Sequence, residues 1–442
     1  MKLKALFLCF FVFCTLGFGQ EGFRYMSSRK SLSIPFKFIN NLIFIPLEIN
    51  GVPVTFLVDT GVEETILFSL DEKSEIQFSN VEKIKLRGLG NAALIEGLKS
   101  SENRIVIRNS IVDKNHVIYI VLDEEFNFSS SIGIPVNGII GYQFFKNFEV
   151  EIDYISNKII IYNPNKSVFD KKKSKYNQFP IEVINNKPYL TTHFNIGSNT
   201  WFGKVLLDIG NSDAFWFFPN QISNFTKPSH TFRDFLGRGF NGDIFGDRSR
   251  VNELNFEKFS FENTLIAFPD SLSIQNIKWV PQRIGSLGGE IFKRFYTVFD
   301  YKRNSLYLKR NKNFKNDFDF NKSGIEVNHA GLQWVSERQN STFSSIDVKI
   351  NEPLNYRDDK IKYKFSLKPM YVIAFVREDS PAALAGLQKE DILLTINNQD
   401  AHNFTLQEIN NLLKAESGKT IQFEVNREGK ILKYTFKLKN LL

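Results

Sequence analysis

Three segments from the first half of this chain recur, in the same order, in its second half. The first set reads FLVDTGVEETILF (56–68), LRGLGNAALIEG (86–97) and VNGIIGYQFFKNFEVEIDYISNKIIIY (136–162). The second set reads VLLDIGNSDAFWF (205–217), FLGRGFNGDIFG (235–246) and RIGSLGGEIFKRFYTVFDYKRNSLYL (283–308). The first two pairs are offset by 149 residues and the third by 147. Such regular spacing predicts two copies of one unit, each of ordinary domain size.

Within each copy the residue pattern is typical of β-strands. Residues 42–61 are predicted to form a hairpin, because β-branched residues flank an Asn50-Gly51 turn. A second hairpin is expected to turn at Ser156-Asn157, and its counterpart in the second copy at Arg303-Asn304. Long amphipathic helices are not evident before residue 320. The predicted fold class is therefore mainly β, with two closed or nearly closed units.

A third unit of a different kind follows the polar segment 314–322. Ser380-Pro381 is typical of a helix start and Gly386 of a helix end. Thr405 to Glu408 reads as a capping box that opens a second helix. Strands are expected around these helices, which makes the unit α+β. We place the three units at 31–165, 175–312 and 325–442, the last with an N-terminal lead-in, joined at the first boundary by the polar segment 163–177.

The first 19 residues read as a secretory signal. Lys2 and Lys4 precede an apolar run over residues 5–16 that is short for a membrane span. The alternative is an uncleaved membrane anchor. Both cysteines of the chain, Cys9 and Cys14, lie in this segment, so the mature chain is expected to have neither a disulfide nor a thiol nucleophile. We therefore expect an exported protein of the periplasm, cell envelope or extracellular space, without a stable membrane span after cleavage.

Charge and histidine content argue against several function classes. The net charge of +8 is spread along the chain, and its one dense run, residues 171–175, is typical of a solvated linker. No aromatic-basic pattern accompanies that run, so nucleic acid is not an expected partner. The five histidines are scattered singly, so neither a metal site nor another cofactor is expected.

The repeated Asp-x-Gly is the strongest candidate for chemistry. If the two copies pack face to face, Asp59 and Asp208 are brought together, and two carboxylates in one site share a proton. The ionised member can deprotonate water while the protonated member donates to a carbonyl oxygen. Gly61 and Gly210 are expected to allow the tight turn that presents each Asp. The alternative role for either Asp is to cap a turn.

In these motifs the chain resembles an aspartic protease of the retropepsin-like kind, with two lobes and a C-terminal PDZ domain, as in the PDZ-bearing aspartyl proteases of Bacteroidota. The strongest motif is Leu57-Val58-Asp59-Thr60-Gly61, with Ile139-Ile140-Gly141 downstream. In the second copy, Leu206-Leu207-Asp208-Ile209-Gly210 is followed by Ser286-Leu287-Gly288. The resemblance covers nearly all of residues 31–442.

The resemblance implies a fold and an activity. The fold would be two tandem acid-protease β-barrel lobes packed as a pseudo-dimer, here called lobe 1 and lobe 2, followed by an α+β PDZ domain. The activity would be hydrolysis of polypeptides by water that Asp59 and Asp208 activate, in a monomer without a cofactor. The glycine-rich stretches 87–97 and 236–246 fall where the family has flap hairpins, which makes flap candidates of Gly88, Gly90, Gly237 and Gly239.

Two departures from the family pattern carry expectations of their own. Isoleucine stands at 209, where the family has a hydroxyl that hydrogen-bonds to the other lobe, as Thr60 is expected to do. The alternative to a protease is therefore a catalytically impaired protein that binds peptides. In the PDZ unit, Glu390 stands where glycine usually precedes Asp391, and no glycine-rich carboxylate-binding loop is found before Tyr371. PDZ domains bind peptides by strand addition, so a peptide ligand is expected, but its terminal carboxylate lacks a predicted site.

Asp153 and Asp300 repeat as regularly as the candidate pair. Each lies at the junction of a strand and a turn. We interpret both as structural residues that hold a turn or form a salt bridge.

Overall fold

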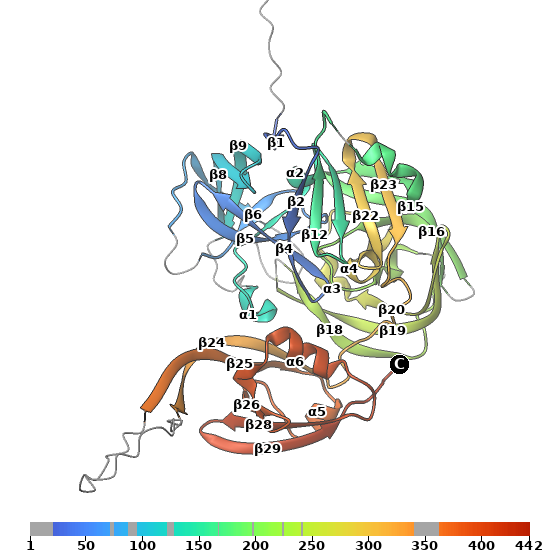
Figure 1. Ribbon diagram of the computed structural model, residues 1–442. Coiled ribbons are helices and arrows are strands. Elements are labelled where there is room, and N and C mark those ends of the chain that lie inside the picture. The colour runs from blue at the N-terminus through green and yellow to red at the C-terminus, as the bar shows by residue number, and fades with distance from the viewer. Residues whose placement is uncertain are drawn as a thin grey trace, which may run out of the picture.

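The computed structural model describes residues 21–70, 75–86, 95–121, 128–166, 168–196, 199–222, 225–239, 242–339 and 362–442. Within these ranges the strands form four sheets: one in each lobe, one shared between the lobes, and one in the C-terminal unit (Figure 1). The fold is mainly β, as predicted, and the signal-like residues 1–19 with Cys9 and Cys14 lie outside the described residues.

The lobe 1 sheet places the first Asp-x-Gly segment beside its downstream glycine motif. Its strands are β1 (Arg24–Tyr25), β3 (Lys37–Ile39), β4 (Leu42–Ile49), β5 (Val52–Val58), β6 (Thr65–Leu67), β7 (Val81–Leu86), β8 (Ile95–Ile107), β9 (Ile111–Val121) and β10 (Gly138–Ile140). Two short helices, α1 (Ser129–Ile132) and α2 (Tyr142–Phe145), flank β10. Strand β10 runs parallel to β5 with Ile140 opposite Val58, so Asp59 emerges next to Gly141.

The lobe 2 sheet repeats this arrangement. Its strands are β14 (Glu182–Ile184), β15 (Lys187–Ile196), β16 (Asn199–Leu207), β17 (Phe215–Phe217), β18 (Thr231–Gly239), β19 (Gly242–Phe256), β20 (Phe259–Pro269) and β21 (Arg283–Leu287). Helices α3 (Ser271–Ile274) and α4 (Gly289–Phe292) flank β21. Strand β21 runs parallel to β16 with Leu287 opposite Leu207, so Asp208 emerges next to Gly288.

A six-stranded sheet joins the two lobes. Its order is β13 (Asn177–Pro180), β23 (Ser305–Arg310), β22 (Phe295–Asp300), β11 (Glu149–Asp153), β12 (Lys158–Tyr162) and β2 (Ser31–Pro35). The central pair, β11 and β22, is antiparallel with one strand from each lobe. Buried residues of both lobes also form one continuous hydrophobic core. The lobes pack together, as the pseudo-dimer expectation implied, but the sheet that they share was not predicted.

The predicted turns are present. Asn50 and Gly51 have φ angles of 50° and 90°, as a tight two-residue hairpin turn requires. Asp153 accepts hydrogen bonds from the amides of Ile155 and Ser156, and Asp300 accepts one from the amide of Arg303. The structural role predicted for both aspartates is confirmed.

The single-turn 3-10 helices of the described chain are η2 (Phe169–Lys171), η3 (Lys173–Lys175), η4 (Pro219–Gln221), η5 (Tyr301–Arg303) and η6 (Ala401–Asn403).

The C-terminal unit has its own core and a five-strand path. The path runs β24 (Ile325–Gln339), β25 (Lys362–Val376), β26 (Ile392–Ile396), β28 (Thr420–Arg427) and β29 (Lys430–Lys437), with β27 (Gln399–Asp400) on β26. The predicted helices are α5 (Pro381–Leu384), capped by Ser380, and α6 (Leu406–Leu413), opened by the Thr405–Glu408 capping box. Glu390 has a φ of 75°, a conformation that favours the glycine usual at this position.

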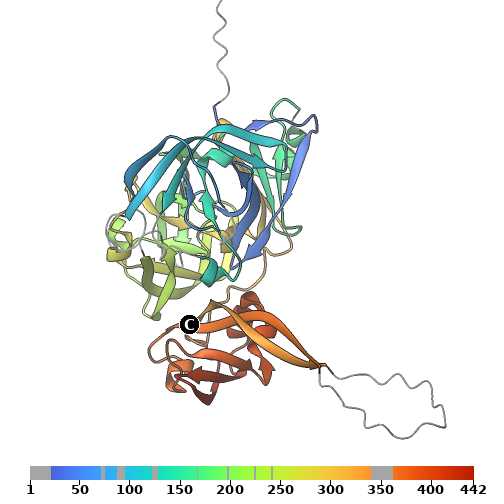
Figure 2. The same cartoon turned by 90° about the vertical axis from the view of Figure 1, so that its left-hand side faces the viewer.

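The C-terminal unit docks on both lobes. Figures 1 and 2 show it as a separate body beneath them, with α1 of lobe 1 above β24 and α6. A Cβ on Gly133, which ends α1, would lie 2.8 Å from the Leu406 Cβ in α6. The Asn40 amide donates to Gln407 Oε1 at 2.9 Å, also in α6. From β25, the Phe375 ring contacts the rings of Phe235 and Phe245 in the β18–β19 hairpin of lobe 2.

A partly buried glutamate at this interface predicts a pH dependence of stability. Burial and the negative charge of Asp234 raise the pKa of Glu326 to about 7. The positive charges of Lys414, Arg248 and Arg377 lower the pKa but offset only part of this rise. Between about pH 4 and pH 7, Glu326 is therefore protonated in the folded state and ionised in the unfolded state. This contribution to stability is present below about pH 4 and is lost as pH rises to 7.

We expect the Glu326→Gln substitution, which mimics the protonated group, to remove this loss. At pH 8 the variant should exceed the wild type in free energy of unfolding by up to about 3 kcal/mol, and the gap should close near pH 4. Chemical denaturation of the full chain at both pH values measures it. The exposed Glu378→Gln is the matched control. An equal difference at pH 4 and pH 8 would contradict the assignment.

Candidate active site

The same backbone construction positions both aspartates. The amide of Asp59 donates to the carbonyl of Ile140 at 3.0 Å, and the amide of Asp208 donates to that of Leu287 at 2.8 Å. Each Asp thus follows an inner strand that is held by the strand of the downstream glycine motif. The parallel strand pairs described above explain why the two motifs of each copy occur together.

The structure brings the Asp59 and Asp208 carboxyl groups into hydrogen-bonding contact. Each carboxyl also rests against the glycine of the opposite motif. A Cβ on Gly61 would lie 2.7 Å from Asp208 Oδ1, and one on Gly210 would overlap the Asp59 carboxyl. Both glycines lie in a turn directly after their Asp, as expected, although neither has a positive φ. In addition, each glycine leaves room for the opposing carboxylate.

The downstream glycines also provide room for a close approach. A Cβ on Gly141 would overlap the Val62 carbonyl, and one on Gly288 would overlap the Asp213 carbonyl. The neighbouring side chains of Ile139, Ile140 and Leu287 are buried. These residues therefore support the loops that carry the aspartates and do not face substrate.

Only one of the two lobes supplies a hydroxyl that ties the motifs together. Thr60 Oγ1 donates to the Leu207 carbonyl at 2.5 Å and accepts from the Ile209 amide at 3.0 Å. The counterpart residue, Ile209, is fully buried in the hydrophobic core shared by the lobes and carries no polar side-chain atom. The contact is thus asymmetric between the lobes.

The electrostatics of the pair are asymmetric too. Burial and the charge of Asp208 raise the pKa of Asp59 well above its usual range, although the Gly61 amide donates to its Oδ1 at 2.6 Å. Burial also raises the pKa of Asp208, but the charge of Arg283 and the hydrogen bond from Asp59 oppose this. The pKa is thus raised at both carboxyl groups, and the pair titrates as a unit that holds one proton where ordinary aspartates are ionised.

Sequence reasoning missed Arg283, which is buried in β21. Its Nη2 donates to Ser286 Oγ at 2.9 Å, and its guanidinium lies over the rings of Tyr189 and Phe218. The position 147 residues earlier is Val136, so the cation has no counterpart in lobe 1. A lone arginine in a strand gives no sequence signal unless the two copies are compared position by position.

Replacing Arg283 by Met removes the cation that favours the ionised form of Asp208. We expect the pKa of Asp208 to rise further above its usual range. The titration profile of the Asp208 carboxyl group, followed by carbon-13 NMR of the full chain, measures this shift. The exposed Lys302→Met is the control in the same lobe. Profiles of Arg283→Met and wild type that coincide would contradict the prediction.

The flap candidates fall on two hairpins. Gly88 and Gly90 lie outside the described residues. In lobe 2, Gly237 and Gly239 lie in β18, which pairs with β19 in a hairpin; Gly237 has a φ of 143° beside a register shift. Glycine suits this bulged position. That either hairpin covers a substrate stays a prediction.

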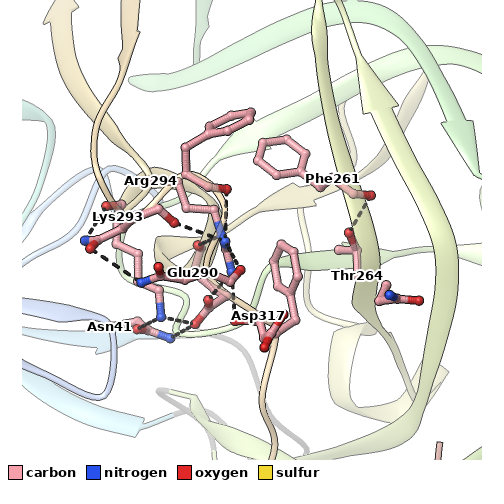
Figure 3. A network of polar contacts seen from close by, with 12 residues as sticks. Asn41, Phe261, Thr264, Glu290, Lys293, Arg294 and Asp317 are labelled. Carbon is pink, nitrogen blue, oxygen red and sulfur yellow. Dashed lines mark hydrogen bonds and ion pairs between the residues drawn. The ribbon is translucent and has the colours of Figure 1, made fainter.

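A polar network next to the Gly288 motif links lobe 1 to lobe 2 (Figure 3). Asn41 Nδ2 donates to the Ser212 carbonyl at 2.9 Å and to Glu290 Oε2 at 2.7 Å. Glu290 Oε1 accepts from the fully buried Arg294, whose guanidinium also donates to the carbonyls of Asn316 and Asp317. The network thus connects the loop after Asp208 to the segment that leads into the C-terminal unit.

A buried Thr–His–Asp cluster lies in lobe 1. His116 Nε2 is 2.7 Å from Thr65 Oγ1, and its Nδ1 is 2.7 Å from Asp113 Oδ2. All three side chains are at least nine-tenths buried, so a substrate has no access to the hydroxyl. The cluster is a structural link between β6 and β9. Among the described residues, no group of three or more His, Cys, Asp or Glu side chains is placed to hold a metal ion.

Comparison with known protein families agrees with this geometry. Residues 45–144 match the family model described as aspartyl protease, and residues 372–427 match the one described as PDZ domain. The chain contains an aspartyl protease domain and a PDZ domain. The aspartyl protease match runs from β4 to α2 and includes Asp59 and Gly141. No curated protein matches the chain. Within the described residues, no helix is long and apolar enough to cross a membrane.

Proposed function

We propose that this protein is an aspartic endopeptidase in which Asp59 and Asp208 jointly activate water. The observation that carries the proposal is the contact between two half-buried carboxyl groups, each set against the glycine of the other lobe and each with a raised pKa. The proposal includes export, on the pattern of residues 1–19, and a polypeptide substrate.

The chemistry follows from the protonation of the pair. The ionised Asp208 takes a proton from a water molecule, whose oxygen attacks the peptide carbonyl carbon. Asp59 gives its proton to the carbonyl oxygen, which yields a neutral tetrahedral diol. Collapse of the diol breaks the C–N bond as Asp208 gives its proton to the amine nitrogen and Asp59 takes a proton from a diol hydroxyl. The products are a carboxylic acid and an amine, and the carboxyl pair is returned to its starting state. No covalent intermediate on the enzyme is needed.

The second candidate is a peptide-binding protein without turnover, favoured by Ile209 at the threonine position. Here the aspartyl protease and PDZ domains would both hold peptides. The edge strand β24 is a place for strand addition in the PDZ domain, although α1 of lobe 1 lies against it. A peptide that adds there has to share β24 with α1 or displace it.

Cleavage of an unfolded protein distinguishes the candidates. The purified chain is incubated with unfolded substrate across acidic to neutral pH, and new termini are counted by mass spectrometry. The endopeptidase predicts new termini with a bell-shaped pH dependence, because one carboxyl must be ionised and the other protonated. Saturable peptide binding with no new termini at any pH would favour the second candidate.

A further inference from the structure

A buried chain of charges runs from the PDZ domain to the loop that carries Asp208. Arg377 Nη1 in the PDZ domain lies 3.0 Å from Asp234 Oδ1 in β18. Asp234 Oδ2 lies 3.0 Å from Arg248 Nε in β19, and Arg248 Nη1 lies 2.7 Å from Asp213 Oδ1. All four side chains are at most 14% exposed. Alternating charges so protected from water interact strongly and are costly to separate.

The last member of this chain, Asp213, is part of the local structure of the site. It lies five residues after Asp208, and its Oδ2 accepts from Trp216 Nε1 at 2.7 Å. Its amide donates to Asn211 Oδ1, and its carbonyl packs on Gly288 and accepts from the Glu290 amide. A shift of Asp213 therefore displaces the loop between Asp208 and β17.

The first member, Arg377, has contacts to a ring and through its backbone besides its ion pair with Asp234. Its guanidinium lies 4.6 Å from the ring centroid of Phe232, and its amide donates to the Gly324 carbonyl at 2.7 Å. Phe375, two residues earlier, contacts Phe235 and Phe245 on the same hairpin. The PDZ domain thus contacts the β18–β19 hairpin both through aromatic rings and through an ion pair. Gly237 and Gly239 lie near the tip of this hairpin.

We propose that the PDZ domain serves as a positioning element for the aspartyl protease site. In this proposal Arg377 acts through Asp234 and Arg248 on Asp213, and the position of Asp213 in turn affects that of Asp208. The inference rests on the proposed function for its kinetic consequence, but not for its structural one. Arg377 is a positioning residue, since it lies outside the carboxyl pair. Release of Arg377 loosens the β18–β19 hairpin and the Asp208 loop together.

Hydrogen exchange of the full chain, followed by mass spectrometry, tests the relay without requiring turnover. In Arg377→Gln we expect faster amide exchange both in residues 232–247 and in residues 208–216. Arg377→Lys, which keeps the charge, should restore part of the protection. Lys433→Gln, an exposed PDZ cation on β29, should change neither segment. Faster exchange in 232–247 alone would overturn the relay, because the coupling would end at the hairpin.

A second variant changes Asp213, at the other end of the chain of charges. It tests the proposal even if Arg377→Gln does not fold. Coupling is reciprocal, so Asp213→Asn should speed exchange in PDZ residues 375–379 as well as in 232–247. Unchanged exchange in 375–379 would overturn the proposal.

The kinetic readout separates this proposal from the proposed function. If the wild type cleaves peptides, Arg377→Gln should lower kcat roughly tenfold with little change in KM, and Arg377→Lys should recover part of it. Equal kcat for Arg377→Gln and wild type would overturn the positioning role while leaving the protease assignment intact. If the wild type does not cleave, the exchange results alone decide the relay.

Discussion

Asp59→Asn and Asp208→Asn are each expected to lower kcat for peptide cleavage by about 10²–10⁴-fold, because each removes one half of the acid–base pair. Asparagine keeps the shape of the side chain, and the close fit against Gly61 and Gly210 makes that shape important. It can neither take a proton from water nor carry one to the carbonyl oxygen. The rate of appearance of new termini in an unfolded substrate measures the effect.

Asp153→Asn is the matched control for these two variants. Asp153 occupies a repeated Asp position of lobe 1, as Asp59 does, but its carboxylate accepts from the Ile155 and Ser156 amides at a hairpin turn. Its replacement should leave kcat near the wild-type value. Cleavage that survives in both Asp59→Asn and Asp208→Asn would refute the assignment of the pair.

Thr60→Val is expected to weaken both stability and activity. Thr60 makes two buried hydrogen bonds to lobe 2, and the variant leaves the Ile209 amide and the Leu207 carbonyl without that partner. Each lost bond costs about 1–3 kcal/mol when its partner stays buried. We expect the free energy of unfolding to fall by roughly 2–4 kcal/mol, and kcat to fall with it as the carboxyl pair loses its fixed spacing. Denaturant unfolding and the cleavage assay measure the two effects.

Ile209 provides the complementary test. Thr60→Ser keeps the hydroxyl, so its free energy of unfolding and its kcat should stay close to the wild-type values. Ile209→Thr adds the hydroxyl that lobe 2 lacks, and by the pseudo-twofold relation it should bond to lobe 1 and raise kcat/KM. In the double variant Thr60→Val/Ile209→Thr the contact runs in the opposite direction, and part of the loss should be recovered. A Thr60→Val protein with wild-type stability and activity would contradict this account.

The sequence alone was sufficient where a local pattern determines a local structure. The duplication predicted that Asp59 and Asp208 belong together, and the Asn50-Gly51 turn and the Thr405–Glu408 capping box formed as their residue types require. These features depend on residues within a few positions of one another or on a repeat that is visible by inspection.

What escaped prediction depends on contacts between distant segments. A hairpin pattern does not reveal its sheet partner, so the pairing of β11 with β22 across the lobes was not foreseen. Asp234, Arg248 and Arg377 read as ordinary charges until the fold buries them together. The lead-in to the PDZ domain contains β24 and most of β25, whose mixed polar and apolar residues lack clear boundaries.

The central claim is that two half-sites form one site with a shared proton. Carbon-13 NMR of the aspartate carboxyl groups in the full chain, with Asp59 and Asp208 assigned by substitution, tests it without reference to turnover. We predict that Asp59 in the wild type titrates well above the ordinary aspartate value of about 3.9, and that its pKa falls in Asp208→Asn because the neighbouring charge is gone. Two carboxyl groups that titrate independently near the ordinary value, each unaffected by replacement of the other, would contradict the account.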